Sequence, residues 1–281
     1  MIIKDASPAA HLRRMLECEE HGMDLAETAL HIAEKEYPGL DVRRYLGRLD
    51  ELAARALSHV PAGAGPAETV AALNRELFDI QGFRGNSQDY YDPRNSYLNE
   101  VLDRRLGIPI TLSIVYMAIG RRLGLALEGV AFPGHFLVKL VTADRMLVLD
   151  PFVHGLALSE PELSLRLQEV LGVDAPVFTT DLLATAGKKE ILARLLRNVK
   201  GIYLHKQEFE RALYMANCLL LLTPNNCDEL RDRGLIHERL ECFRAALQDY
   251  QRYLELAPRA ADSHEIKSRL PTLQSATARL N

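Results

Sequence analysis

His135 and Asp150 are the residues of this sequence whose types and spacing first suggest chemistry. An imidazole beside a carboxylate can act as a general base, because the carboxylate orients the ring and favours its protonated form. The same pair can instead stiffen a strand end through a hydrogen bond. His154 follows closely, but two histidines and one carboxylate without rigid spacing make a poor metal site. We therefore expect neither a metal nor another cofactor.

Two predicted strands position this pair. Alternating apolar residues predict three strands and one turn: strands over 127–132, 135–141 and 146–149, with the turn over 142–145. The turn pairs Val141 with Met146, so Leu137 lies opposite Asp150. His135 then points to the same sheet face as Asp150, as a diagonal neighbour about 7–8 Å away at the backbone. A slip of one residue would put the two side chains on opposite faces.

Helices are expected on both sides of these strands. Capping signals predict one that Asp24 opens and another that begins at Asp41. Gly107 ends a helical segment over 96–106, and Pro109 suits the first turn of the next helix. That next helix is apolar nearly all round, so it should lie in the middle of its domain.

Composition restricts the function classes. The 281 residues suffice for two domains, and 48% hydrophobic with 26% charged residues is typical of a globular protein. A net charge of −4 disfavours nucleic acid as a partner. The longest uncharged run, 107–120, is too short to cross a bilayer, and we see no export signal. We expect a cytoplasmic protein without a membrane partner, whose four cysteines stay reduced: Cys18, Cys218, Cys227 and Cys242.

The last third contains an internal repeat. Shifting the sequence by 34 residues, which is the tetratricopeptide period, aligns nine identical pairs. The pairs are Leu196 and Leu230, Arg197 and Arg231, Ile202 and Ile236, Phe209 and Phe243, Ala212 and Ala246, Leu213 and Leu247, Leu220 and Leu254, Leu222 and Leu256, and Pro224 and Pro258. The residues 262–279 are typical of a capping helix.

Two repeats are fewer than the three that such arrays normally need. The pair should lean on the preceding domain or on another subunit, so a homodimer is one alternative. Arg194, Arg197 and Arg231 fall on the first helices of the repeats and could receive the carboxylate of a peptide. They could equally be solvated or form salt bridges within the chain.

Three motifs carry a family resemblance: NSYLNEVLDRRLGIPITLS over 95–113, RLGL over 122–125 and GVAFPGHFLV over 129–138. They resemble a bacterial family that joins a transglutaminase-like core, also found in an F-box protein, to tetratricopeptide repeats. The resemblance implies a mostly helical α+β fold with a papain-like core, in which a central helix packs on a small antiparallel sheet. It also implies an N-terminal helical lobe over 1–66, the core over 67–185, and two repeats with a cap over 186–281.

In such cores the central helix begins with a nucleophilic cysteine, and the strands carry a histidine and then an aspartate. His135 and Asp150 stand at the histidine and aspartate positions, but no cysteine occurs over 109–113. The hydroxyls of Thr111 and Ser113 are poor substitutes, because their pKa values are far higher than that of a thiol.

We therefore expect a non-catalytic interaction or regulatory protein, a pseudoenzyme that holds a protein or peptide partner through its repeats. The alternative is a hydrolase or acyltransferase in which His135 and Asp150 activate Thr111, Ser113 or a water. A third alternative is a core that binds a small ligand at His135 without turnover.

The polar and aromatic loop over 81–95 adds candidate binding residues. Asn86, Tyr91 and Asn95 could rim a cleft beside the start of the central helix. The alternative is that the tyrosine rings of this loop only pack, with their hydroxyls at the surface.

Overall fold

The computed structural model describes residues 8–142, 146–172 and 176–279. It divides into two compact units, the first ending at Leu195 and the second starting at Leu196. Helices predominate and the sheets are small, so the predicted α+β class is confirmed. In the described ranges, no helix is both long and apolar enough to cross a membrane. The finer division at residues 66 and 185 stays a prediction.

The first unit begins with helices whose starts follow the predicted caps. The carboxylate of Asp24 accepts a hydrogen bond from the backbone N–H of Glu27, and that of Asp41 accepts one from Arg44. These helices are α1 (Pro8–Glu17), α2 (Leu25–Ala33), α3 (Val42–Ser58) and α4 (Pro66–Asn74), with a short 3-10 turn, η1 (Glu20–Gly22), and a π-helical turn, η2 (Arg75–Ile80).

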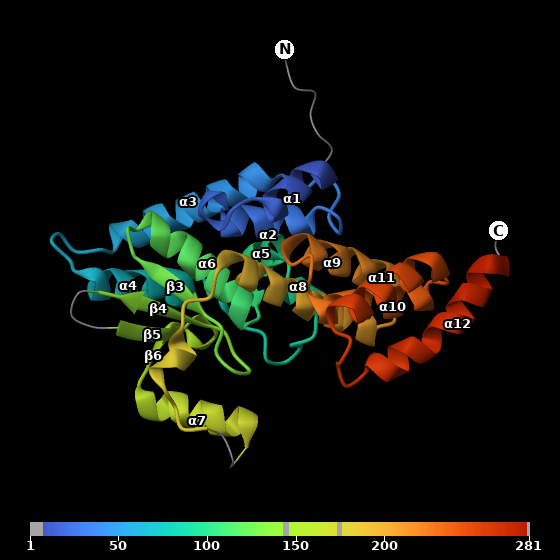
Figure 1. Ribbon diagram of the computed structural model, residues 1–281. Helices are drawn as coiled ribbons and strands as arrows, with labels where there is room; N and C mark the ends of the chain where they lie inside the picture. Colours follow the sequence, from blue (N-terminus) through green and yellow to red (C-terminus); the bar gives the residue numbers. More distant parts are fainter. Residues whose placement is uncertain (1–7, 143–145, 173–175, 280–281) are drawn as a thin grey trace. The chain divides into compact units, whose positions relative to one another are not determined.

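Helix α6 (Pro109–Arg122) is the central helix of the first unit. It contacts α2 and α3 on one side and the strands β3 (Leu127–Val130) and β4 (Leu137–Val141) on the other, as Figure 1 shows. The predicted central position is confirmed. Its sequence explains this, because a helix that is apolar nearly all round is stable only when surrounded.

The main sheet is antiparallel, in the order β3, β4, β5 (Met146–Asp150) and β6 (Leu156–Leu158). Val141 pairs with Met146, so the predicted hairpin register is confirmed. Of the predicted turn over 142–145, residues 143–145 lie outside the described residues. A second, two-stranded sheet pairs β1 (Arg84–Gly85) in parallel with β2 (Leu106–Gly107). Around it lie η3 (Pro93–Asn95) and α5 (Leu98–Arg104).

Helix α7 (Glu160–Leu171) covers part of the main, four-stranded sheet through Leu163 and Leu167. A short 3-10 turn, η4 (Pro151–Val153), lies between β5 and β6, and another, η5 (Thr180–Leu183), lies between α7 and α8. The buried core here consists of Val130, Phe132, Leu137, Val148, Leu158, Leu163, Leu167 and Leu183. Neither α7 nor β6 is predicted from the sequence.

The second unit consists of paired helices. Helix α8 (Lys188–His205) starts in the first unit and continues into the second. The helices α9 (Phe209–Leu222) and α11 (Phe243–Leu256) begin and end 34 residues apart, which confirms the predicted repeat. The remaining helices are α10 (Cys227–Arg239) and α12 (Ser263–Arg279), the expected cap.

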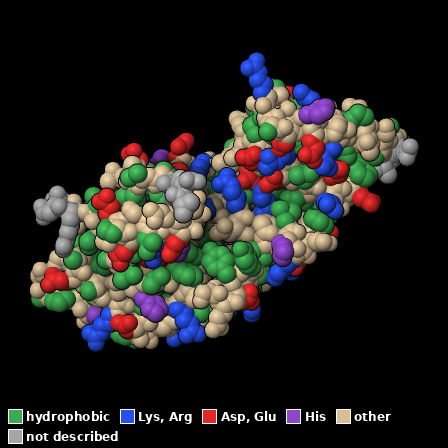
Figure 2. Space-filling view, turned by 90° about the horizontal axis from the view of Figure 1, so that it is seen from below, with side chains coloured by type: hydrophobic (Ala, Val, Ile, Leu, Met, Phe, Trp, Pro, Cys, Tyr) green, Lys and Arg blue, Asp and Glu red, His purple; other side chains and the backbone are tan. Residues whose placement is uncertain are grey.

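Ion pairs are numerous in the second unit. The buried ammonium of Lys200 lies 2.5 Å from a carboxylate oxygen of Glu229 and 2.7 Å from one of Asp232. Acidic and basic side chains are intermixed on the right-hand part of the surface in Figure 2, where the last helices of the chain lie. Charges of both signs are therefore used to join neighbouring helices rather than to form a single-sign field.

Candidate functional site

The candidate site centres on the pair that the sequence predicts. Nε2 of His135 lies 3.0 and 3.1 Å from the two carboxylate oxygens of Asp150. His135 ends the turn that precedes β4, and Asp150 ends β5, so the hairpin register brings them together. Asp150 is fully buried, whereas the side chain of His135 is 19% exposed. The predicted proximity is confirmed, while a catalytic role stays a prediction.

Asp150 has further donors. Arg166 of α7 donates to its second oxygen, and the backbone N–H of Phe152 donates to the first at 3.0 Å. Burial alone would raise the pKa of Asp150, but the hydrogen bonds and the electrostatic attraction of His135 and Arg166 outweigh it and hold the pKa below its ordinary value. Asp150 is therefore an anion that fixes three neighbouring segments.

Arg194 contacts the backbone of the same turn. Its guanidinium donates to the carbonyl oxygen of His135 at 2.8 Å and to that of Phe132 at 3.4 Å, and it lies 5.7 Å from the centre of the Phe136 ring. Burial lowers the pKa of Arg194. In this geometry Arg194 orients the turn that carries the imidazole, and its predicted role in binding a peptide carboxylate stays a prediction.

A series of aromatic rings leads from the imidazole to the surface. The ring of His135 lies 5.8 Å from that of Phe152, Phe152 lies 6.4 Å from Tyr90, and Tyr90 lies 5.4 Å from the exposed Tyr91. A Cβ atom at Gly85 would come within 2.5 Å of the Phe152 ring, so this ring would have to shift to admit any other residue there. Phe152 and Arg166 are site residues that the sequence did not predict, because nothing in their spacing relates them to His135.

Asn86 and Asn95 hold the loop beside the site. The amide of Asn86 donates to that of Asn95 at 3.0 Å, and the amide of Asn95 donates to the backbone carbonyl of Asp89 at 2.7 Å. Both asparagines are buried, whereas Tyr91 is 72% exposed. The asparagines therefore order the loop, and Tyr91 is the predicted loop residue whose ring a ligand could reach.

The hydroxyls at the start of α6 are not engaged with His135. Thr111 donates to the carbonyl oxygen of Asn95 at 2.7 Å and accepts from the backbone N–H of Ile108 at 3.1 Å. Ser113 is fully buried, and its hydroxyl has no hydrogen-bond partner among the described residues. Neither hydroxyl is bonded to His135 in the described part of the chain, so this geometry gives a nucleophilic Thr111 or Ser113 no support.

No metal site is evident in the ranges 8–142, 146–172 and 176–279, where no three histidine, cysteine or acidic side chains are grouped to hold an ion. The ring of His154 instead packs 5.7 Å from that of Phe78. All four cysteines are free, and burial raises the pKa of Cys218 to about 12, so its thiol is unreactive.

The two repeat arginines make ion pairs within the second unit. Nε of Arg197 lies 2.7 Å from Glu229, and the guanidinium of Arg231 lies 2.9 Å from Asp262 and 3.1 Å from Asp232. A peptide carboxylate would have to compete with these partners, which is the salt-bridged alternative that the sequence left open. Peptide binding by these arginines stays a prediction.

Comparison with known proteins identifies both units. The model of the Transglutaminase-like superfamily matches residues 43–197, and that of the Tetratricopeptide repeat matches residues 199–271. A UPF0162 protein of Xylella fastidiosa is 40% identical over 92% of both chains. The UPF0162 protein YchA of Escherichia coli is 30% identical, covering 90% of this chain and 91% of its own. Protein SirB1 of Salmonella typhimurium is 29% identical, with the same coverage. Following these matches, the chain belongs to the transglutaminase-like superfamily and, within it, to the UPF0162 family of proteins with a carboxy-terminal tetratricopeptide unit.

Proposed function

We propose that this protein is a non-catalytic interaction or regulatory protein. One observation carries the proposal: no cysteine occurs at the start of α6, and the hydroxyl of Thr111 there is hydrogen-bonded to the backbone of Asn95 and Ile108. A transglutaminase-like core needs an activated nucleophile at this point, and a buried, hydrogen-bonded hydroxyl is a weak one. The core then acts as a scaffold.

The pair of His135 and Asp150 is useful in such a scaffold. Asp150 accepts hydrogen bonds from the turn before β4, from the backbone of η4 and from Arg166 of α7. A buried carboxylate that is fully hydrogen-bonded fixes one arrangement of the segments around it. The pair can therefore have a structural role that needs no nucleophile.

The repeat unit is the proposed partner-binding part, because tetratricopeptide repeats typically mediate protein interactions. It contains a hollow of about 340 Å³ lined by Leu204, Gln207, Phe209, Asp232, Leu235, Ile236 and Arg239. A lining of four apolar side chains beside two charged ones, Asp232 and Arg239, suits a hydrophobic side chain of a partner. A cytoplasmic location and a homodimer belong to the same proposal, the first from the composition and the second from the small number of repeats.

A second candidate function is a hydrolase that uses a water. It is favoured by one observation: Nδ1 of His135, the ring nitrogen opposite Asp150, makes no hydrogen bond with any described residue. An imidazole oriented by Asp150 could take a proton from a water there.

Turnover measurements separate the two functions. We expect purified protein to show no turnover on a panel of peptide, amide and ester substrates beyond that of His135→Gln, with His21→Gln as a surface control. Turnover that is present in the wild type and in the control but lost in His135→Gln would overturn the non-catalytic proposal and favour the hydrolase.

Partner binding is tested with the full chain. A protein captured from cell extract is purified, and the Kd of its complex is measured with the wild type and with two variants. Arg239→Glu changes the lining of the hollow, and Arg252→Glu is a control on an exposed part of α11. We expect Arg239→Glu to weaken binding at least tenfold and Arg252→Glu to leave it unchanged. Equal affinities for all three would reject the hollow as the binding surface.

A further inference from the structure

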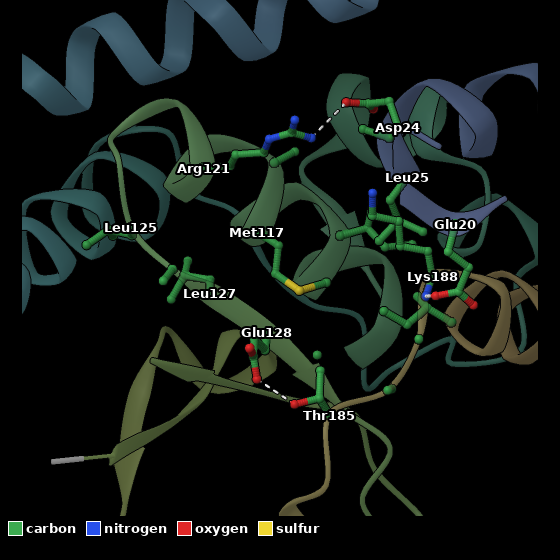
Figure 3. Close-up of a pocket in the computed structure, with 18 of the residues that line it drawn as sticks. Glu20, Asp24, Leu25, Met117, Arg121, Leu125, Leu127, Glu128, Thr185 and Lys188 are labelled. Carbon is green, nitrogen blue, oxygen red and sulfur yellow. Dashed lines mark hydrogen bonds and ion pairs between the residues drawn. The ribbon is translucent and has the colours of Figure 1, made fainter. Parts of the chain in front are cut away.

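A cavity of about 450 Å³ lies in the first unit, lined by residues that take no part in the cluster around His135 (Figure 3). Its walls come from the start of α2, from one face of α6, from β3 and the residues before it, and from the segment that leads into α8. Cavities of this size commonly hold small molecules. We propose that it binds a small amphipathic anion, a molecule with an apolar body and a single carboxylate.

The apolar part of the site is a face of the central helix. Met117 and Ala118 lie three and four residues after Ile114, and Arg121 lies four and three residues after them, so the four residues form one stripe along α6. Although this helix lies in the middle of the unit, Met117 and Ala118 are only half-buried, because the cavity and not another element faces them. In Figure 3 the thioether of Met117 lies between the pair Arg121–Asp24 and the pair Glu128–Thr185.

Further apolar side chains complete the walls. They are Leu25, Ala26, Leu125, Leu127, Ala186 and Ile191. A flexible thioether among aliphatic side chains adapts to ligands of different shape. The body of the ligand should therefore be an aliphatic chain or a small ring.

The carboxylates around the cavity are already engaged. Glu20 accepts from the backbone N–H groups of Lys188 and Lys189, at 3.1 Å each. Glu128 accepts from the hydroxyl of Thr185 and lies 3.4 Å from the ammonium of Lys139, and the Thr185 hydroxyl is the main reason that its pKa is lowered. A cationic ligand would have to displace these partners.

Two cations keep unused donors. The ammonium of Lys188 donates to the carbonyl oxygen of Met23 at 2.6 Å and makes no ion pair with a carboxylate among the described residues, which leaves two of its three donors. Arg121 is 72% exposed, and its ion pair with Asp24 is long at 3.6 Å. The two cations contact adjacent residues, Met23 and Asp24, so an anionic head group beside the start of α2 would be attracted by both, and this sets the sign of the ligand charge.

The test uses two probes with the same apolar body, octanoate and octanol, titrated calorimetrically into the full chain. We expect octanoate to bind with a stoichiometry of one and more tightly than octanol. Lys188→Gln and Arg121→Gln should each weaken the binding of octanoate by about fivefold and leave the affinity for octanol unchanged. The matched control is Arg105→Gln, which lies outside the cavity lining.

Ala118→Phe should fill the cavity and abolish the binding of both probes. If this variant does not fold, the two charge variants decide alone, because their side chains are not part of the packed core. Three results would each overturn the proposal. They are no binding of octanoate, the same affinity for octanol as for octanoate, and undiminished binding of the probes by a folded Ala118→Phe variant.

Discussion

At the scale of single residues, Asp150 determines how the candidate site is built. It is fully buried, yet its carboxylate accepts from His135, from Arg166 and from the backbone of Phe152. Taking a carboxylate out of water is costly, and only several donors with opposite charge can compensate for it. Because the pKa of Asp150 is lowered, the folded state favours its charged form.

We expect Asp150→Asn to lower the free energy of unfolding by about 3 kcal/mol at pH 7, because Arg166 loses its buried counter-charge. A carboxyl group whose pKa is lower in the folded state stabilises the fold above its unfolded pKa, and this contribution is lost as the pH falls through the folded value. The difference in free energy of unfolding between wild type and variant should therefore have its full size at pH 7 and decrease below about pH 4.

Urea unfolding at several pH values measures this difference. Asp228→Asn is the control, since its side chain is 76% exposed and its ion pair should contribute less than about 1 kcal/mol. A variant at position 150 that behaves like this control at pH 7 would show that the network does not stabilise the fold.

At the scale of elements, the turns inside the two repeats share an unusual backbone. Gln207 between α8 and α9 has a φ of 59°, and Glu241 between α10 and α11 has a φ of 56°. These positions are 34 residues apart, so both repeats use the same left-handed turn. A residue with a side chain is strained there, whereas glycine adopts this conformation freely.

We expect Gln207→Gly and Glu241→Gly each to raise stability by about 0.5 kcal/mol, as relief of the strain exceeds the greater freedom of glycine in the unfolded chain. Gln248→Gly, inside α11, should instead lower it by about 1 kcal/mol. Thermal unfolding midpoints of the three variants provide the comparison. Destabilisation by both turn variants would contradict the strain argument.

Elements with local signals could be predicted from the sequence, and contacts between distant segments could not. A period of 34 and a two-residue alternation identify the repeats and the hairpin, and the hairpin brings His135 to Asp150. Helix α7 buries only Leu163 and Leu167, which is too weak a pattern to read. Arg166 and the bonded hydroxyl of Thr111 therefore could not be foreseen, because their roles depend on how separate segments meet.

At the scale of the whole molecule, α8 belongs to both units. Its first turn is capped from the first unit by the carboxylate of Glu20, which accepts from the N–H groups of Lys188 and Lys189. Such a cap typically contributes about 1 kcal/mol to a helix. The same helix continues beyond Leu195 and provides the first helix of the repeats.

We expect Glu20→Gln to speed amide hydrogen exchange throughout α8 by up to about fivefold, including residues beyond 195, because the helix loses its amino-terminal cap. Exposed Glu17 offers a matched control in Glu17→Gln. Faster exchange that stops within the first turn of α8 would show that the cap does not influence the rest of the helix.

The continuity of α8 also decides how the protein can be dissected. A fragment that begins at Leu196 would open in the middle of α8 and would lack the first turns of that helix. A fragment that stops at Leu195 would end with four unpaired backbone carbonyls in the last turn of the truncated helix. Repeat fragments should therefore start at or before Gly187, and core fragments should extend to the end of α8 at His205, so that each includes the whole of the shared helix.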